Sequence, residues 1–216
     1  MANRRRGGVQ DPPLSIGSVV GAAVRVTERV GLDQLTVRLV ADELQVTAPA
    51  VHYHLRGKDD LLDRVCEEVA ARIDLTVAPE AGWAEQYVAL VLSMERTLGR
   101  YPGVAMRALA ATGESAAAWR IAAAATGILR RAGLDQEETA QAFAASQFLL
   151  TGWLVLRHGS GRGAAHPALK AAGVAPPAGA TVSQLETAVR RLLAGFRPAG
   201  RPRTPSDLPD TSRPVA

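Results

Sequence analysis

Residues 35–62 read LTVRLVADELQVTAPAVHYHLRGKDDLL, and this stretch decides the fold of the N-terminal part of the chain. Thr36 is placed to cap a short helix, and Gln45 with its successor forms a tight turn. Thr47 is placed to cap a further helix over 48–54. Two short helices joined by a tight turn, with the second opening at a capping threonine, are typical of a helix-turn-helix.

A third helix is expected immediately before this pair, over 16–30. Ser15 can cap it, its apolar residues recur every three or four positions, and Gly31 can end it. Such a helix has one buried face. The first 55 residues are therefore expected to form three short helices that pack on one another.

The helix over 48–54 has an apolar side and a polar side. Val46, Val51 and Leu55 have the spacing to pack against the supporting helices. Methyl and methylene groups on the outer side can contact thymine methyls, and hydroxyl and imidazole groups can bind phosphates or base edges. By spacing alone, a helical hairpin with a polar outer face fits as well as a DNA reader. The outward residues are Thr47, Ala48, Pro49, His52, Tyr53 and His54.

The rest of the chain also shows helical periodicity, and strand patterns are almost absent, so the sequence predicts an all-α protein. A helix from Lys58 to Val77 is expected to link the two halves and to end near Pro79. The connection from 159 is rich in Gly, Ala and Pro, with a turn of helix expected at 167–172. The further helices are expected over 83–99, 104–111, 114–132, 135–158 and 181–196.

The composition describes a globular chain of 216 residues, 47% apolar and 21% charged, with a formal net charge of +4. This basic balance fits a nucleic-acid partner without requiring one. Cys66 stands alone, which excludes an internal disulfide, and we expect it in the core. The longest nearly uncharged run, 142–156, is shorter than the roughly 18–20 residues of a bilayer span, so no transmembrane helix is expected. No apolar signal segment follows the arginines of 3–8, which predicts a cytoplasmic protein.

Residues 35–55, together with Lys58-Asp59-Asp60-Leu61-Leu62, resemble the DNA-binding domain of the TetR/AcrR family of transcriptional repressors. The resemblance covers about a quarter of the chain, from Ser15 to about Val69. It implies a helix-turn-helix DNA-binding domain over 14–62 and a larger helical ligand-binding and dimerisation domain over 63–197. A basic flexible arm over 1–13 and a disordered tail over 198–216 complete the expected division.

The resemblance also implies which residues contact DNA. Arg38 would bind a phosphate or guanine, Thr47 and Lys58 would bind phosphate, and the remaining residues would line the groove or meet its backbone. Two positions depart from the family pattern, because Gln45 stands where glycine is usual and His52 where tyrosine is commoner. The complete expected set is Arg38, Thr47, Ala48, Pro49, Ala50, His52, Tyr53, His54 and Lys58.

In the larger domain the resemblance implies an inducer cavity and a dimer interface. The helices over 135–158 and 181–196 have broad apolar faces, which either pair with their copies or pack inside one subunit. The tetracycline site of the family's namesake uses histidine, and His158 and His166 are poorly placed for that role, so tetracycline is not expected. The expected ligand-binding residues are Tyr87, Met94, Met106, Trp119, Phe143, Gln147, Phe148 and Thr151.

The sequence therefore predicts a ligand-responsive repressor that binds a palindromic operator as a homodimer and is released by a small organic inducer. A helix-turn-helix regulator or activator without an inducer stays open, as does, with less support, an enzyme that uses the helical cavity. The chain shows no nucleophile with a base and no spaced pair of carboxylates. We therefore expect no enzyme activity and no cofactor. We also expect no metal, because His52 and His54 point to different sides of a helix.

Overall fold

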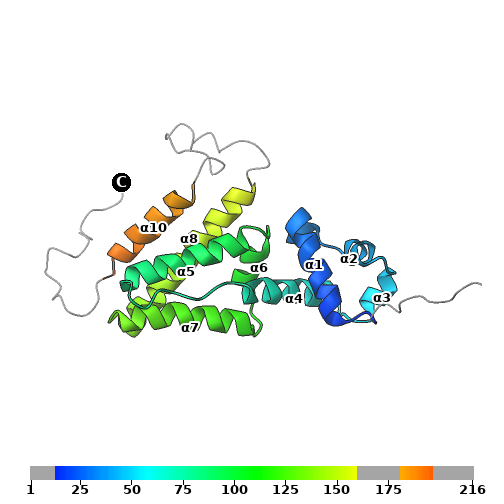
Figure 1. Cartoon of the computed structure of the whole chain (residues 1–216), viewed down its shortest axis with the longest axis horizontal. Coiled ribbons are helices and arrows are strands. Elements are labelled where there is room, and N and C mark those ends of the chain that lie inside the picture. Colours follow the sequence, from blue (N-terminus) through cyan, green and yellow to red (C-terminus); the bar gives the residue numbers. More distant parts are fainter. Residues whose placement is uncertain (1–12, 160–180, 197–216) are drawn as a thin grey trace, which may run out of the picture.

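The structure is a computed structural model that describes residues 13–159 and 181–196, and every regular element in these ranges is helical (Figure 1). The expected all-α class is confirmed. The N-terminal group contains α1 (Ile16–Val30), the 3₁₀ helix η1 (Leu32–Gln34), α2 (Val37–Leu44) and α3 (Ala48–His52), and α4 (Lys58–Ala71) leads away from it. The larger group contains α5 (Trp83–Leu98), α6 (Val104–Ala110), α7 (Ala116–Arg131), α8 (Gln136–Gly159) and α10 (Val182–Ala194).

The first helix begins and ends where its local signals predict. The Ser15 side chain accepts a hydrogen bond from the Ser18 N–H at 3.1 Å, and the Ser15 N–H donates to Ser18 Oγ at 3.0 Å. At the other end, Gly31 adopts φ 85°, a backbone conformation that costs glycine little, and its N–H donates to the Thr27 carbonyl. Both boundaries are thus set by hydrogen bonds within a few residues.

The turn between α2 and α3 has the tight geometry expected of a helix-turn-helix. Thr36 Oγ1 accepts the Leu39 N–H at 3.2 Å and so caps α2. Gln45 ends α2 in the left-handed region, with φ 56°. Outside glycine this conformation is unfavourable, because the Cβ crowds the backbone. The turn therefore places a residue other than glycine in the left-handed region, at a cost in conformational free energy.

The third helix is shorter than expected and lacks the expected cap. It covers Ala48–His52 instead of reaching residue 54, and the Thr47 side chain makes no capping hydrogen bond. The N–H groups of His54 and Leu55 each bond to the carbonyl three residues earlier, so the helix tightens into turns there. Gly57 then takes φ 138°, a conformation outside the helical region.

The linking helix α4 ends at Ala71, whereas the sequence predicted a helix as far as residue 77. Beyond it, residues 73, 75 and 77 are turned inward and residues 74 and 76 are exposed, an alternation typical of an extended segment. The Thr76 N–H donates to Asp74 Oδ1 at 2.9 Å, which competes with helical hydrogen bonding and lowers the pKa of that carboxyl. The apolar spacing alone did not distinguish the two conformations.

Two contacts join the N-terminal group to the loop between α5 and α6. The Leu32 N–H donates to the Pro102 carbonyl at 2.8 Å, and the Arg100 guanidinium pairs with Glu28 at 2.7 Å. Gly103, with φ 88°, lies so close to Leu32 that an added Cβ would stand 3.1 Å from the Leu32 Cβ. The end of α1 is therefore fixed against the larger group independently of α4.

The last helix begins as expected after Thr181, whose N–H donates to Gln184 Oε1 at 2.8 Å. Three further expectations fall outside the described residues. They concern the basic arm before residue 13, the connection over 160–180 with its turn of helix at 167–172, and the tail from residue 198.

The helix α8 over Gln136–His158 is longer than the uncharged run 142–156 and is long and apolar enough, by length and composition only, to cross a membrane. One such helix is weak evidence, because core helices of soluble proteins pass the same test. Within this single chain, 33% of its most apolar window is buried. The exposed remainder of α8 is an apolar face whose partner is considered below.

Candidate nucleic-acid interface and ligand cavity

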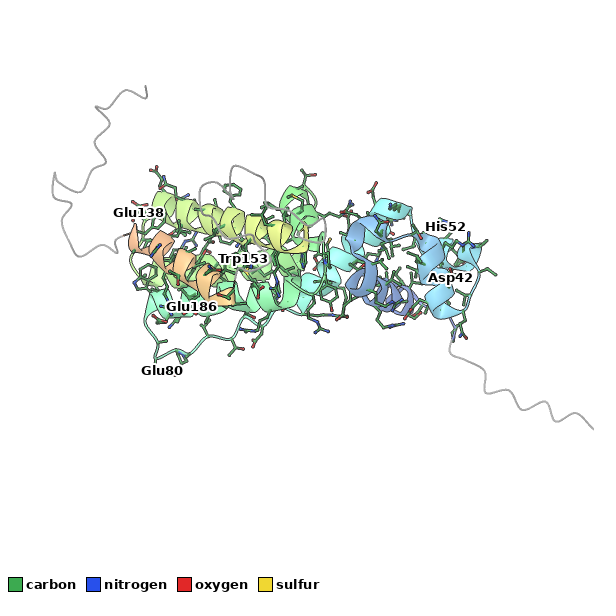
Figure 2. All side chains as sticks on the ribbon, turned by 90° about the horizontal axis from the view of Figure 1, so that it is seen from above. Asp42, His52, Glu80, Glu138, Trp153 and Glu186 are labelled. Atoms are coloured by element: carbon green, nitrogen blue, oxygen red, sulfur yellow. The ribbon has the colours of Figure 1, made fainter. Side chains whose placement is uncertain are left out.

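The residues expected to contact DNA gather on the outer side of α2 and α3, and we call this set the reader surface. Val51 is completely buried against the supporting helices, with Val46 and Leu55 half-buried beside it. Tyr53, by contrast, is 88% exposed. Figure 2 places His52 at the end of the molecule remote from Trp153 and Glu186. Arg38, Thr47, Pro49, His52, Tyr53 and Lys58 are exposed, and Ala48, Ala50 and His54 are half-buried.

The reader surface is braced from both sides. Glu43 of α2 accepts hydrogen bonds from Arg25 at 2.8 Å and Arg29 at 2.6 Å, both on α1. These two guanidinium groups lower the pKa of the Glu43 carboxyl, Arg25 most strongly. The pairs fix the angle between α1 and α2 by contacts that lie at the protein surface.

The start of α4 is fixed next to the reader surface. The Arg56 N–H donates to Asp60 Oδ2 at 3.0 Å, and Arg64 Nε donates to Asp60 Oδ1 at 2.9 Å. These hydrogen bonds, the backbone one first, lower the pKa of the Asp60 carboxyl. Lys58, in the same turn, stays exposed and has no such partner among the described residues. Its ammonium group is available for a phosphate.

The N-terminal geometry agrees with what related sequences show. A family model described as bacterial regulatory proteins, tetR family, matches residues 19–65, which cover most of α1, all of α2 and α3, and the first half of α4. Residues 19–65 are therefore a DNA-binding domain of the TetR/AcrR type. The members of that family are transcriptional regulators and not enzymes. The helix-turn-helix is the part of this chain that carries the match.

The curated relatives match over less than half of this chain. An HTH-type transcriptional regulator of Saccharopolyspora erythraea is 35% identical over 101 residues, which cover 47% of this chain and 42% of that protein. The class D tetracycline repressor protein of Escherichia coli is 34% identical over 86 residues, 39% of each chain. The chain thus matches about two fifths of the length of these relatives.

Solved structures extend the likeness to the larger group. The TetR-Q116A variant from Acinetobacter baumannii AYE, in complex with minocycline, is 25% identical, with a TM-score of 0.67 over 85% of this chain and 93% of that one. ActR from Streptomyces coelicolor, in complex with actinorhodin, is 20% identical, with a TM-score of 0.67 over 85% and 95%. At the latter identity the likeness concerns the fold alone.

A cavity of about 880 Å³ opens between α4 and the helices α5 to α8. Its volume falls within the range of small-molecule sites, roughly 300–1,000 Å³. Four of the eight expected ligand-binding residues lie on its wall: Met94, Phe143, Gln147 and Thr151. The larger group therefore contains a space large enough for a small molecule.

The other four expected ligand-binding residues lie elsewhere. Met106, Trp119 and Phe148 are 48%, 71% and 65% exposed and do not line the cavity. Tyr87 is buried, and its hydroxyl lies 2.7 Å from Ser146 Oγ. Burial raises the pKa of Tyr87 to about 12. The apolar character of these four residues pointed to the larger helical group. Which side of its helix each residue lies on depends on packing between helices, which the sequence does not show.

The remaining wall residues come mostly from α4, α6 and the segment that follows α6, and the sequence reasoning missed them. Cys66, expected in the core, is buried there, and burial raises the pKa of its thiol to about 11. Most of the others are small or charged residues with no motif to mark them. They include Asp63, Arg64, Glu67, Ala70, Ala105, Arg107, Ala108, Leu109, Glu114, Ser115, Ile121 and Ala122.

The linking helix α4 is held at its N-terminal half by α6. The Arg107 guanidinium donates to Asp63 Oδ1 at 2.7 Å and to Asp59 Oδ1 at 3.1 Å. Arg107 also lies on the cavity wall. One side chain thus contacts both the cavity and the first two turns of the helix that begins at Lys58.

The C-terminal half of α4 and the start of α7 cap each other. Glu67 accepts the Ala117 N–H at 2.9 Å and the Ser115 hydroxyl, which satisfies donors at the start of α7. In return, Arg120 of α7 donates to the Ala71 carbonyl at 3.4 Å and to the Ile73 carbonyl at 3.5 Å. The two helices therefore share their end groups.

The outer side of α8 carries exposed apolar side chains next to α10. Phe148, Val155 and Leu156 recur at helical spacing and are 40% to 65% exposed. Val182 of α10 is 41% exposed, and α8 and α10 pack side by side (Figure 1). An apolar stripe of this kind on two neighbouring helices is typical of a helix–helix interface.

Proposed function

We propose that the protein is a ligand-responsive repressor that binds a palindromic operator as a homodimer and is released by a small organic inducer. Residues 14–62 act as the DNA-binding domain and residues 63–197 as the regulatory and dimerisation domain, in the cytoplasm. The observation that carries the proposal is the exposed reader surface in a DNA-binding domain of the TetR/AcrR type. A cavity in the larger domain supports an inducer over a regulator without one.

The reader surface supplies the two kinds of contact that a DNA reader needs. Arg38, Thr47 and Lys58 provide groups for phosphates and guanine edges, and the guanidinium of Arg38 can make two hydrogen bonds at once. Ala48, Pro49 and Ala50 provide apolar contacts for thymine methyls, and His52, Tyr53 and His54 can meet bases or backbone. Positions in the second set would determine the operator sequence.

Operator selection tests this proposal directly. Genomic fragments retained by the purified protein are sequenced, and the enriched sequence is titrated by fluorescence polarisation at physiological salt. We expect a palindromic preference and a weaker affinity for Arg38→Ala and Lys58→Ala, with the salt slope of Lys58→Ala reduced by about 1. Arg130→Ala, exposed at the end of α7 and far from the reader surface, is the matched control. The absence of any sequence preference would refute the proposal.

The exposed apolar face of α8, with Val182 of α10, is the surface on which we propose that two copies pair. A dimer places two reader surfaces on successive half-sites, which a palindromic operator requires. Phe148→Glu introduces a charge into this face and is expected to give monomers by analytical ultracentrifugation. Trp119→Glu on α7, equally exposed, is the control and should leave dimers intact.

The inducer would act through α4. A molecule in the cavity lies against Arg107, which binds Asp59 and Asp63 beside Lys58. Release requires that the inducer bind the DNA-free arrangement more tightly than the operator-bound one, and couplings of about 1–3 kcal/mol change affinity roughly 5- to 150-fold. Several relatives are named tetracycline repressors. In this chain, His158 Nε2 lies 2.9 Å from the Gly99 carbonyl oxygen, and His158 is not on the cavity wall. This position does not support tetracycline as the inducer.

A further inference from the structure

The α8 wall of the cavity carries two polar side chains that the fold leaves without partners. Thr151 is only 7% exposed and lies on the cavity wall. Gln147, one helical turn earlier, lies on the same wall. Within 13–159 and 181–196, neither side chain makes a hydrogen bond. A polar group as buried as Thr151 is usually paired, so its unpaired hydroxyl on a cavity wall, beside the half-buried Gln147, calls for a physical reason.

Other threonines in the helices of this chain show what Thr151 does not do. The hydroxyls of Thr27, Thr126 and Thr187 donate to the carbonyl four residues earlier, at 2.9, 2.8 and 2.9 Å. This bond is the ordinary way in which a helical threonine satisfies its own hydroxyl. Thr151 has no such bond, and neither has Thr139 earlier in α8; Thr151 differs from Thr139 in lying on the cavity wall, where its donor and acceptor capacity can be used by a ligand.

The charged side chains on the cavity wall, in contrast, are paired with protein groups. Arg107 is bound by Asp59 and Asp63, and Arg64 by Asp60. Glu67 accepts two hydrogen bonds at the start of α7. Glu114 has no such partner among the described residues, but it is exposed to water. No buried, uncompensated charge on this wall offers a counter-ion to a charged ligand. The free energy needed to remove water from that charge would therefore not be offset.

Most of the remaining wall is apolar. Met94, Phe143 and Ile121 face the space from three helices, and the alanines of α6 and α7 keep it wide. Sites of this composition bind a molecule by burying its apolar surface and orient it through a few polar groups. Of the other neutral polar residues on the wall, Thr112 is exposed and the Ser115 hydroxyl is bonded to Glu67, so Gln147 and Thr151 of α8 are the pair best placed to orient a ligand.

From these observations we propose that the cavity binds an uncharged, largely apolar molecule and orients it through a hydroxyl or carbonyl oxygen held by Thr151 and Gln147. The proposal rests on the proposed inducer function and names the chemical class of the inducer. Thr151 donates to or accepts from that oxygen, and the Gln147 amide can do both. Anions are disfavoured because the wall carries three acidic residues, Asp63, Glu67 and Glu114, against two arginines, Arg64 and Arg107, and both arginines are already paired with carboxylates.

Four fluorescent probes that share one ring system separate these features. They are pyrene, 1-pyrenemethanol, 1-pyrenecarboxylate and 1-pyrenemethylammonium, each titrated into the full-length protein without DNA. We expect 1-pyrenemethanol to bind most tightly and 1-pyrenecarboxylate most weakly. Their dissociation constants should differ at least tenfold, because burying one unpaired charge costs more than the roughly 1.4 kcal/mol that corresponds to a tenfold change. A charged probe that binds as tightly as the alcohol would overturn the proposal, as would binding by none of the four.

Two variants locate the binding and the hydrogen bond. Thr151→Val keeps the shape of the side chain, so it should weaken 1-pyrenemethanol about fivefold and leave pyrene unchanged. Thr187→Val, on exposed α10, is the matched control. Ala122→Phe narrows the cavity and should weaken all four probes, with folding checked by thermal unfolding. Equal effects of Thr151→Val on alcohol and pyrene, or probes that still bind Ala122→Phe at full strength, would contradict the assignment.

The probe titrations test the ligand class independently of the proposed repressor function. Operator binding is measured without any probe, and probe binding is measured without DNA. A protein that selects a palindrome but prefers the charged probes refutes the ligand class and leaves the repressor proposal intact. A protein that binds the alcohol in the expected order but selects no DNA sequence refutes the repressor proposal.

Discussion

The two groups of helices in this chain are held together by contacts of different range. In the N-terminal group, the bonds that set helix boundaries join residues three to five apart, as between Ser15 and Ser18 or Thr36 and Leu39. In the larger group, decisive side-chain contacts span 59 residues between Tyr87 and Ser146 and 105 between Glu85 and Arg190. Local contacts leave a pattern in the sequence, whereas distant ones do not.

The relatives show the same difference. The family model matches residues 19–65, while the larger group is recognised mainly through its three-dimensional likeness to solved structures. A reader of DNA must keep its helix-turn-helix geometry, whereas a ligand cavity can vary its wall on the same helical framework. This difference predicts that substitutions will separate the two groups experimentally.

The largest difference between the effects on the two helical groups is expected from Val51→Asp. Val51 is fully buried in the N-terminal group, so an unpaired carboxylate there should destabilise that group by about 4 kcal/mol or more. All three tryptophans, at positions 83, 119 and 153, lie in the larger group and report its unfolding alone. We expect operator binding and some helical circular dichroism to be lost while the tryptophan fluorescence transition persists. A single joint transition would show that the groups are not separable.

A smaller effect, confined to the larger group, is expected from Arg157→Leu. Arg157 of α8 is the ion-pair partner of Glu95, whose side chain is only 3% exposed. Leaving Glu95 unpaired should cost about 2 kcal/mol, less than the roughly 3–5 of a fully buried pair, because 43% of the Arg157 side chain is exposed. Chemical denaturation followed by tryptophan fluorescence measures the loss. The double variant Glu95→Met, Arg157→Leu should recover most of it, and no recovery would point to another cause.

A gain in stability is expected from Gln45→Gly in the N-terminal group. Gln45 adopts φ 56°, where glycine avoids the crowding of a Cβ. After the greater unfolded-state entropy of glycine is subtracted, the variant should be about 0.5–1 kcal/mol more stable. Gln34→Gly, in η1 without positive φ, is the control and should not stabilise. A destabilised Gln45→Gly would mean that the Gln45 side chain contributes contacts of its own.

The smallest effect is expected from pH and concerns the braces of the reader surface. The pKa of the Glu43 carboxyl is lowered in the folded protein by Arg25 and Arg29, so the stability that it supplies is present above its unfolded-state pKa and is lost as pH falls through the lower folded-state value. The wild type should therefore lose more stability than Glu43→Gln between neutral and acidic pH. Equal losses in the two proteins, measured by urea denaturation across that range, would argue against the brace.

Local signals also explain which parts of the fold could be predicted. The caps at Ser15 and Thr36 and the tight turn at Gln45 were predicted from residue type and spacing, and the structure confirms each. The left-handed conformation of Gln45 could not be predicted, because glutamine does not favour it. The end of α4 could not be predicted, because Ile73, Leu75 and Val77 fit a helical stripe and an extended alternation about equally well. Thr47 has the residue type of a cap but not its hydrogen bond.

The candidate sites divide along the same line. The reader surface was predictable because its exposed side follows once Val51 is placed inside. On the cavity wall, Phe143, Gln147 and Thr151 were found because they share one side of one helix. Arg107 and Glu67 were missed, since their partners lie 40 or more residues away in the sequence.

The hydrogen bonds that join the end of α4 to the start of α7 should make these two helix ends move together. Glu67 and Arg120 fix the C-terminal half of α4 to the start of α7, so α4 would tilt about that end, and the contacts that resist the tilt at its other end are those of Arg107 with Asp59 and Asp63. The 14 residues of α4 span about 21 Å, so a tilt of about 10° would displace Lys58 by about 4 Å. A displacement of that size exceeds the reach of a hydrogen bond, so under the proposed function a small rearrangement around a bound inducer would be enough to break a contact between Lys58 and a DNA phosphate.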